Sequence, residues 1–578
     1  MFCFRSIKIA APIALRQLLS SSPRIISAIT AASPRRALST VVGAQDDIFN
    51  YTSGRWVYNE ALRQQERRTV FNVDGLKRLA AQSVNRSVDD VVGFSKHAED
   101  NTHRSFIVTL RDGWQMIARI PYPMTVPKYY TVASEAATIE YLRSSGVPAP
   151  KVYGYSPDSA NAGGTAYLLT EHVPGARLSE VWPRLDDREI ISVINQLTQL
   201  EVRMMALSFP AGGSIFFAKD LEKVAPGLGI PLDDKEFCIG PDLRLPLWYK
   251  GREKFVTDRG PYKTADAAFT AGAHKGLAYL KQFGQPSLPS RRERRRSLGF
   301  QAQLPSDHVE NLNRFLSVAP ALVPKDPTLT RFCIQHPDIQ LDSIFVSRST
   351  VTGEYEITGL TDWQHTAVLP MFLLAGLPRG IETRTVFDPY SLPPPALSDD
   401  FAELDADEQE GDMHFYRRQL IHYHYLTSTK QHNPRHHAAF TDPLHALRGA
   451  LFAQASAPWA GESIDLKDAL IEAVATEKWD ALTAGAGAPV PCPVAFDAAD
   501  LQETAALHEK VKKADRYFMC VQGVSRLGED GWVSPENYEH AMQFLEEYKD
   551  EQLEETRSVD ERNAVLDHWP WNDRDEMK

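Results

Sequence analysis

The chain has 578 residues, of which 43% are hydrophobic and 24% are charged, and its formal net charge is −12. This apolar content excludes a wholly disordered chain, and no run of eighteen uncharged apolar residues predicts a membrane-spanning helix. The acidic balance argues against a nucleic-acid binder, and the five cysteines, with no CxxC pair, indicate neither a disulfide framework nor a zinc site. The length allows two to four domains or one elaborated enzyme.

The N-terminal segment has the composition of a mitochondrial transit peptide. Residues 1–45 contain six basic residues, many serines and no acid. Arg16 and Arg24 interrupt the apolar stretches, which disfavours a secretory signal, and residues 35–40 look like a processing site. A disordered basic tail is the alternative. Loss of this leader would change the net charge from −12 to −18, so we expect an acidic mature protein in the mitochondrion.

The following part predicts a small lobe of strands and one helix. Residues 106–110 and 115–120 are apolar, β-branched runs on either side of the Asp112-Gly113 turn, which is a strong hairpin signal. Residues 131–145 carry apolar side chains at helical spacing, and residues 167–170 form another apolar strand. The order strand, strand, helix, strand is typical of a small α+β lobe.

Helical periodicity dominates after Ser179 and again over residues 401–578, where a Pro/Gly/Ala-rich linker covers residues 484–493. The Arg-rich residues 287–298 favour a solvated surface loop over a phosphosite or docking segment. Residues 414–437 are rich in histidine, but no cysteine or carboxylate completes a known metal spacing, so we expect satisfied or surface histidines. These histidines are His414, His422, His424, His432, His436 and His437.

Two aspartates carry the chemistry that the sequence suggests. His336-x-Asp338 precedes a short strand at residues 344–346, and a second strand at residues 355–360 returns to end near Asp362. A hairpin of this kind brings both carboxylates to one end of the strand pair. One of them can accept the proton of an attacking hydroxyl while the other holds Mg²⁺ against nucleotide phosphates. The alternative interpretation is that Asp338 and Asp362 are ordinary carboxylates of turns.

Ordered motifs along the chain strengthen the phosphoryl-transfer interpretation. They include Gly146-Val-Pro-Ala-Pro, Cys238-Ile-Gly-Pro, His336-Pro-Asp, Asp362-Trp-Gln and the terminal Trp569-Pro-Trp. In these motifs the chain resembles the kinase-like aminoglycoside phosphotransferase and choline kinase superfamily. Within it, the chain is similar to the fungal mitochondrial branch called altered inheritance of mitochondria protein 9, from about Asp47 to the C-terminus.

The resemblance implies an α+β, bilobal protein-kinase-like fold with a small β-sheet N-lobe and a large helical C-lobe. On this basis, the transit peptide is expected at residues 1–45, the N-lobe at residues 46–175, the C-lobe with insertions at residues 176–480, and a linker with a helical extension at residues 481–578. ATP and Mg²⁺ are the implied cofactors, and a small molecule with a hydroxyl group is the implied acceptor.

The resemblance also implies roles for individual residues. Asp338 matches the catalytic base and His336 the histidine that orders its loop. Asp362 matches the principal Mg²⁺ ligand, with Ser343 at the position of a second ligand. Arg119 takes the place of the phosphate-contacting lysine, and Glu135 that of its ion-pair partner. The hinge whose backbone meets adenine covers Leu169, Glu171 and Val173.

Three departures from the family pattern leave a second interpretation open. The loop that should cover the phosphates, residues 97–104, has no glycine and two acids, which only a metal or Arg104 would offset. Arg119 replaces a lysine, and Ser343 replaces an asparagine, although Asp342 could substitute for it. The chain is therefore expected to be either a phosphotransferase or a kinase-fold pseudoenzyme that binds a nucleotide or a partner. Acidic residues at 399–407 could attract a cationic acceptor, but a solvated loop is the plainer interpretation.

Overall fold

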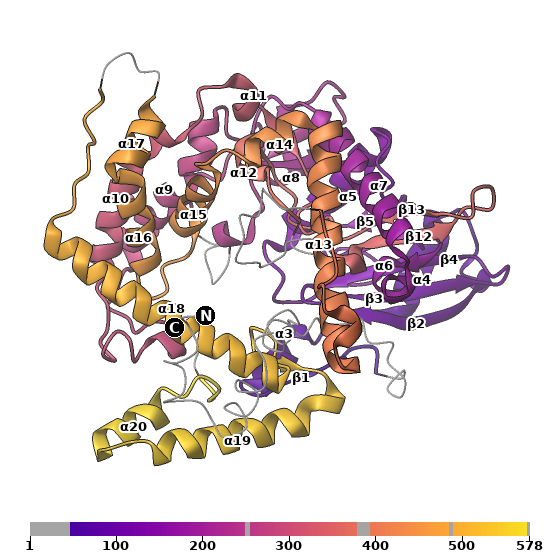
Figure 1. Ribbon diagram of the computed structural model, residues 1–578. Coiled ribbons are helices and arrows are strands. Elements are labelled where there is room, and N and C mark those ends of the chain that lie inside the picture. The colour runs from indigo at the N-terminus through magenta and orange to yellow at the C-terminus, as the bar shows by residue number, and fades with distance from the viewer. Residues whose placement is uncertain (1–46, 249–254, 379–393, 485–488, 575–578) are drawn as a thin grey trace.

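The computed structural model describes residues 47–248, 255–378, 394–484 and 489–574, so the predicted leader lies outside the described residues (Figure 1). The N-lobe is built on an antiparallel five-stranded sheet in the order β2-β3-β4-β6-β5. The predicted hairpin is confirmed, since β3 and β4 pair across a turn in which Gly113 adopts a φ of 84°. The strands are β2 (Val91–Glu99), β3 (His103–Leu110), β4 (Gln115–Pro121), β5 (Val152–Ser156) and β6 (Tyr167–Glu171).

The alternation of side chains along these strands separates the core of the N-lobe from the cleft. Phe106, Val108 and Ala118 are fully buried with Leu76 from α4 (Val73–Ser83). Arg119, one residue further along β4, therefore lies on the opposite face of the sheet. On that side, α5 (Lys128–Ser144) contacts β5 and the C-lobe strand β8 (Ser214–Phe217). The predicted helix is confirmed, and it begins three residues earlier than residue 131.

The C-lobe core is centred on two long helices that pack against each other, α7 (Asp187–Ala206) and α13 (Ala406–His432). The Asp186 side chain accepts from the amide of Glu189, whose carboxylate accepts from the Asp186 amide, so α7 begins with a capping box. One hydrophobic core continues from α5 through α7 to the short strands β11 (Phe332–Ile334), β12 (Ile344–Arg348), β13 (Tyr355–Leu360) and β14 (Val368–Pro370).

A second hydrophobic core forms the far end of the C-lobe from later helices. Phe269, Phe315 and Leu451 are fully buried in it. Its helices are α9 (Ala265–Phe283), α10 (Pro305–Leu322), α15 (His445–Ser456), α16 (Ile464–Val474) and α17 (Thr476–Thr483). The remaining elements of the two lobes are α3 (Glu60–Arg67), β7 (Ala176–Arg177), α6 (Leu178–Val181), α8 (Ala218–Val224), β9 (Ile230–Pro231), β10 (Phe237–Gly240), α11 (Pro327–Thr330), α12 (Met371–Leu374) and α14 (Pro434–Phe440).

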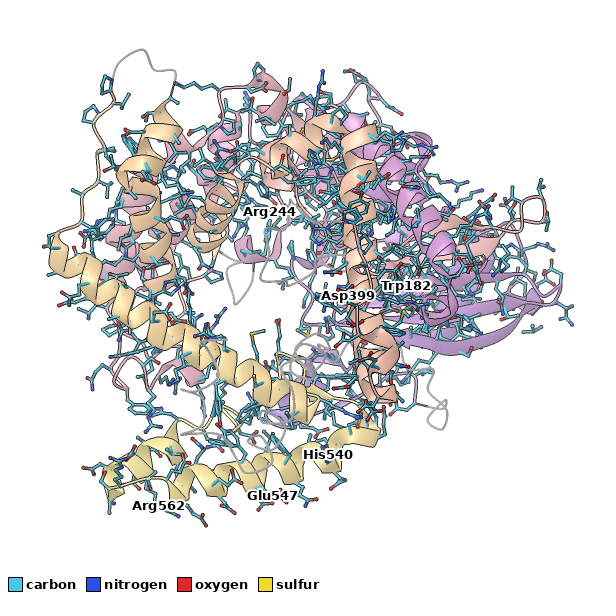
Figure 2. All side chains as sticks on the ribbon, in the orientation of Figure 1. Trp182, Arg244, Asp399, His540, Glu547 and Arg562 are labelled. Atoms are coloured by element: carbon cyan, nitrogen blue, oxygen red, sulfur yellow. The ribbon has the colours of Figure 1, made fainter. Side chains whose placement is uncertain are left out.

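The C-terminal extension returns to the start of the described chain. It comprises α18 (Ala498–Ser525), β15 (Trp532–Val533), α19 (Tyr538–Glu554) and α20 (Val559–Asp567), and β15 pairs with β1 (Arg55–Trp56). Figure 1 shows α18 crossing from the side of α16 to the side of α3 and β1. The outer surface of α19 and α20 carries charged side chains such as Glu547 and Arg562 (Figure 2).

The Arg-rich stretch attaches this extension to the C-lobe, so the interpretation as a solvated loop holds for Arg291 and Arg296 but is wrong for Arg294. Arg294 is 3% exposed, and its guanidinium donates to Asp465 at 2.7 Å, Glu462 at 3.2 Å and Asp515 at 2.5 Å. Asp515 belongs to α18, which makes Arg294 a link between the extension and α16. The sequence shows the charges, but their partners lie about 170 and 221 residues away.

The His-rich region shows no sign of a metal site in the part of the chain that the structure describes. His422 and His436 are fully buried, and burial lowers the pKa of His436 to about 3. His436 departs from the prediction of satisfied or surface histidines: its Nε2 accepts from the Gly376 amide at 3.3 Å, but its Nδ1 has no partner among the described residues. Among the described residues, no helix is long and apolar enough to cross a membrane.

Candidate active site

The two lobes and the C-terminal extension enclose a cavity of about 1270 Å³. Its walls are the β2–β3 hairpin, the hinge after β6, the loop around Asp338, the loop around Asp362 and the end of α18. Eight of the nine predicted site residues lie here or bond directly to residues of this wall. The cavity is lined by Asp338, Ser343, Asp362, Arg119, Glu171 and Val173, while Glu135 is bonded to Arg119 and His336 to Asp338 and Thr361.

His336 joins the two loops that carry the aspartates. Its Nε2 donates to the carbonyl of Thr361 at 2.7 Å, and its Nδ1 accepts from the amide of Asp338 at 3.2 Å. The ring also packs edge-on against Trp363, with 4.4 Å between ring centroids. Burial lowers the pKa of His336, which keeps the ring neutral and able to accept at Nδ1. This geometry suits the predicted loop-ordering role.

Asp338 and Asp362 both present carboxylates to the cavity. Asp338 is exposed, and its Oδ2 accepts from Gln340 Nε2 at 2.7 Å. Asp362 follows β13 with a left-handed φ of 69°, and its side chain is 41% exposed. Left-handed backbone is unfavourable for a residue with a Cβ, so the loop fixes the direction of this carboxylate at some conformational cost.

Arg119 is surrounded by partners from three separate segments. Its Nη1 donates to Glu135 at 2.5 Å, as predicted for the strand-to-helix ion pair. Its Nη2 donates to Gln364 Oε1 at 2.5 Å and lies 3.5 Å from Asp362, while Nε donates to His103 Nε2 at 2.7 Å. Burial opposes the charge on Arg119, but Glu135 and Asp362 outweigh it and raise the pKa of the guanidinium.

The hairpin tip that should cover phosphates with backbone amides presents side chains instead. Asp100 Oδ1 accepts from the amides of Thr102 and His103, each at 2.7 Å, and its Oδ2 lies 2.8 Å from His103 Nδ1. Thr102 Oγ1 accepts from Gln364 Nε2 at 3.0 Å, which ties the hairpin to the Asp362 loop. Sequence reasoning found this loop but not the roles of His103, Thr102 and Gln364.

The position of His103 could have been predicted from the register of the β3–β4 hairpin. Ser105 pairs directly with Arg119, so His103, two residues earlier, projects from the same face of β3 as Ser105. The other acid of the loop, Glu99, does not line the cavity. It accepts from Arg104 Nε at 2.6 Å, and both side chains are almost completely buried, so Arg104 does not offset charge beside a phosphate.

Ser343 does not fit the predicted role of a metal ligand. It is 3% exposed, its Oγ donates to the carbonyl of Gln340 at 2.9 Å, and the same Oγ accepts from the Gln340 amide at 3.1 Å. The hydroxyl therefore stabilises the turn after Asp338. Asp362 does fit, because its partly exposed carboxylate faces the cavity. Asp342 lines the same cavity.

The hinge residues divide between the cavity and the sheet. Glu171 and Val173 line the cavity together with His172 and Thr170. Leu169 does not reach it, since this residue is fully buried in the sheet core and pairs with Ala118. Opposite the hinge, burial together with Arg177 and His172 lowers the pKa of His97 to about 4, so this wall presents a neutral imidazole.

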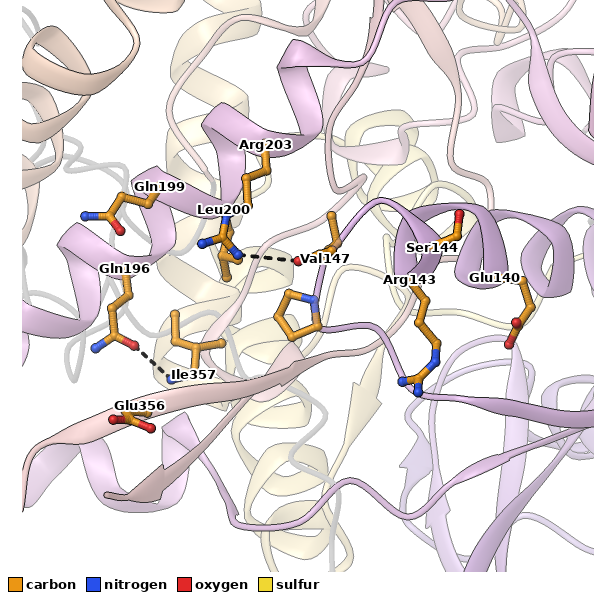
Figure 3. Close-up of a pocket in the computed structure, with 12 residues that line it drawn as sticks. Glu140, Arg143, Ser144, Val147, Gln196, Gln199, Leu200, Arg203, Glu356 and Ile357 are labelled. Atoms are coloured by element: carbon orange, nitrogen blue, oxygen red, sulfur yellow. Dashed lines mark hydrogen bonds between the residues drawn. The ribbon is translucent and has the colours of Figure 1, made fainter. Parts of the chain in front are cut away.

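A second cavity of about 660 Å³ lies on another face and contains none of the predicted site residues (Figure 3). It is bordered by the end of α5, by α7 and by β13. Gln196 accepts from the amide of Ile357 at 2.9 Å, and Arg203 donates to the carbonyl of Gly146 at 3.4 Å. These contacts serve the packing of α7 against its neighbours.

Comparisons with known proteins agree with the phosphotransferase interpretation. Residues 93–235, from β2 to beyond β9, match the phosphotransferase enzyme family. A subtelomeric hrmA-associated cluster protein of Aspergillus fumigatus is 27% identical over 83% of this chain and 97% of its own length. The protein named altered inheritance of mitochondria protein 9, mitochondrial, of Candida tropicalis is 26% identical over 31% of this chain and 34% of its own length.

A solved structure, the streptomycin–ATP ternary complex of APH(2″)-IIa, covers 70% of this chain and 96% of its own at 9% identity, with a TM-score of 0.32. The predicted α+β bilobal fold is confirmed by the family match together with the small sheet lobe and the larger helical lobe described above.

The names of the Candida relatives bear out the predicted mitochondrial localisation. The family match ends at residue 235, before His336 and Asp362.

Proposed function

Because residues 93–235 match the phosphotransferase enzyme family, we propose that this chain transfers the γ-phosphate of ATP to a hydroxyl of a small metabolite in the mitochondrion, with Mg²⁺ as cofactor. One observation carries the proposal. Asp338 and Asp362 line one cavity and are joined through His336, while the Arg119–Glu135 ion pair lies in the same wall. Turn carboxylates without a shared role would not need this connection.

The residues divide the work in the following way. Asp338 accepts the proton of the acceptor hydroxyl or orients that hydroxyl, and its exposure leaves it open to a substrate. His336 holds the Asp338 loop against Thr361. Asp362 would hold the Mg²⁺ ion, which when bound neutralises charge on the nucleotide phosphates. Arg119, held by Glu135 and 3.5 Å from Asp362, would supply positive charge to a phosphate oxygen.

The nucleotide base is assigned to the hinge side of the cavity, near Glu171 and Val173. The acceptor is assigned to the opposite side, where the end of α18 contributes Met519 and Gln522 to the wall and the loop after it contributes Glu529. This assignment makes the C-terminal extension part of the acceptor site. We leave the acceptor as a hydroxylated small molecule, since the cavity carries groups of both charge signs.

The test is a thermal-shift titration of the protein with ATP, with and without MgCl₂. Binding to the folded state stabilises it by about 2.7 kcal/mol at one hundred times the dissociation constant. We expect a Mg²⁺-dependent stabilisation that Asp362→Asn abolishes and that Asp338→Asn retains. Glu554→Gln, an exposed substitution on α19, serves as the matched control. Absence of any response to nucleotide would refute the proposal.

Turnover is tested separately, because Asp338→Asn should abolish phosphate transfer while nucleotide binding persists. A comparison of metabolites between cells with and without the gene supplies candidate acceptors for a phosphotransfer assay. Transfer by the wild-type protein and its loss in Asp338→Asn are the expected pair of results. Equal transfer by both proteins would remove Asp338 from the mechanism.

A second candidate function is a nucleotide- or partner-binding pseudoenzyme. It is favoured by the Thr102–Gln364 contact, which ties the phosphate-covering hairpin across the cavity, and by the inward hydroxyl of Ser343. This candidate predicts nucleotide stabilisation that is independent of Mg²⁺ and of Asp362, with no transfer to any acceptor. The two functions therefore differ in the first titration.

A further inference from the structure

We propose that Asp100, His103 and Asp362 form a binding site for a divalent transition cation, with Mn²⁺ or Zn²⁺ preferred over Mg²⁺. The site shares Asp362 with the Mg²⁺ role proposed above and goes beyond it, because its two other ligands come from the hairpin tip and one of them is a nitrogen. It requires neither a nucleotide nor an acceptor. It can therefore be tested whether or not the chain transfers phosphate.

The geometry brings three ligand atoms from distant segments to one point. One nitrogen of His103 and one oxygen each of Asp100 and Asp362 all lie within 4.8 Å of one another. Among the residues that the structure describes, this is the group of histidine, cysteine and acidic side chains that meets this condition. All three residues line the cavity of about 1270 Å³, so an ion has access from solvent.

Two of the ligands are held in place before any ion binds. Asp100 Oδ1 is occupied by the amides of Thr102 and His103, which leaves Oδ2 directed at the His103 ring. His103 is 8% exposed, so its ring has little freedom to turn away. Rigid ligands lose little conformational entropy on binding, which favours affinity.

The charges around the three proposed ligand atoms favour a divalent cation. Asp100, Glu135 and Asp362 supply three carboxylates, and the Arg119 guanidinium faces all three of them. Three formal negative charges against the one positive charge of Arg119 leave a formal charge of −2 on these four residues. A divalent ion would neutralise that charge.

The His103 ring couples the ion to Arg119, because the guanidinium contacts both ring nitrogens. Arg119 Nε donates to His103 Nε2 at 2.7 Å, and Arg119 Nη2 lies 3.2 Å from His103 Nδ1. An ion bound to either ring nitrogen must displace the guanidinium from that nitrogen, since one lone pair cannot serve both. The Arg119–Glu135 pair can remain.

The ligand set indicates the class of ion. An imidazole nitrogen suits Zn²⁺ and its neighbours, and Mn²⁺ accepts both carboxylates and imidazole, whereas Mg²⁺ prefers oxygen ligands in an octahedron. An all-oxygen pair of Asp362 and a second side-chain oxygen would have suited Mg²⁺. Because Ser343 turns inward and His103 takes part, the nitrogen ligand shifts the preference to the transition ions.

The test titrates the full chain with MnCl₂, ZnCl₂ and MgCl₂ by calorimetry, with no nucleotide present. We expect Mn²⁺ and Zn²⁺ to bind at least about tenfold more tightly than Mg²⁺. Asp100→Asn and His103→Asn should each weaken Mn²⁺ binding at least about tenfold. Glu180→Gln, a carboxylate change in the same cavity but outside the group, should leave it unchanged.

Two further readouts separate a ligand role from a folding effect. Bound Mn²⁺ should show ¹⁴N coupling in pulsed electron paramagnetic resonance, and His103→Asn should remove it. Arg119→Met should tighten Mn²⁺ binding, because it removes a positive charge and frees both nitrogens of the His103 ring. Equal binding of Mg²⁺ and Mn²⁺, absence of ¹⁴N coupling, or Mn²⁺ binding that survives both Asp100→Asn and His103→Asn would overturn the proposal.

Discussion

At the scale of single residues, burial decides what each ionisable group can do. Glu201 of α7 is a carboxyl enclosed beside the loop that carries the candidate base. Tyr425 donates to its Oε2 at 2.8 Å, and Gln335, the residue before His336, donates to its Oε1 at 2.8 Å. Burial raises the pKa of Glu201 to about 7, and the two donors oppose this only in part. Glu201 is therefore protonated in the folded protein under mildly acidic conditions.

The raised pKa of Glu201 predicts that stability falls as the pH rises. The folded state retains this proton up to about pH 7, whereas the unfolded chain releases it near 4.5. The contribution is complete below pH 4.5 and is lost by pH 7, and it amounts to something on the order of 3 kcal/mol. Glu201→Gln should flatten the decline of the thermal midpoint between pH 5 and 7.5. Glu554→Gln should keep the wild-type decline, and parallel curves for wild type and Glu201→Gln would contradict the assignment.

At the scale of elements, the β2–β3 hairpin is held by one buried carboxylate rather than by a flexible glycine loop. Glu99 accepts from Arg104 Nε at 2.6 Å and from the amides of Thr52 and Ser53 at 2.8 and 2.9 Å. Lys96 lies 3.3 Å from the same carboxylate. These bonds attach the hairpin to the segment before β1, so we expect a rigid hairpin.

Removal of this carboxylate should loosen the hairpin. Glu99→Ala leaves Arg104 and Lys96 as buried cations without their acid, a change that costs about 3–5 kcal/mol in comparable buried pairs. We expect a lower thermal midpoint and faster amide hydrogen exchange over residues 98–105 than in wild type. Asp112→Asn, at the exposed turn of the neighbouring β3–β4 hairpin, is the control. Unchanged exchange in Glu99→Ala would show that other contacts hold the hairpin.

At the scale of the whole molecule, the C-terminal extension connects parts that are distant in the sequence. It pairs β15 with β1, and Asp530 accepts from Trp56 Nε1 at 3.1 Å. At its other end, Arg294 links α18 to α16. Since the end of α18 also lines the large cavity, the attachment of the extension bears on the shape of the candidate active site.

Loss of Arg294 should detach the extension from the C-lobe. Arg294→Met leaves Glu462, Asp465 and Asp515 close together without their cation, which we expect to destabilise this contact by about 3–5 kcal/mol. Limited proteolysis should then cut near α18 earlier than in wild type. Arg296→Met removes a largely exposed arginine of the same stretch, which pairs with Glu561, and should have a small effect. Equal cleavage in both variants would argue against Arg294 as the attachment point.

Local patterns were sufficient for the N-lobe hairpin, for α5 and for the pair of loops that carry Asp338 and Asp362. Each of these rests on signals within a few residues, such as the turn at Gly113 or the apolar spacing of α5. The Arg119–Glu135 pair joins neighbouring elements and was predicted from the family resemblance. Contacts between segments that are distant in the sequence could not be predicted from local patterns. The burial of Arg294, the inward hydroxyl of Ser343 and the core position of Leu169 are examples.

By itself, the sequence determined the alternation of polar and apolar residues, the turn positions and the order of the charged motifs, and with them the small α+β lobe. The two-lobed fold followed from the family resemblance that these motifs carry. Only the tertiary structure decided which charges meet. His103 faces Arg119 across one hairpin, and Gln364 reaches the same guanidinium from 245 residues away. The physical reason is that the energy of an ion pair depends on the distance between the two charges and on how far each is removed from water. The spacing of residues along the chain fixes neither quantity.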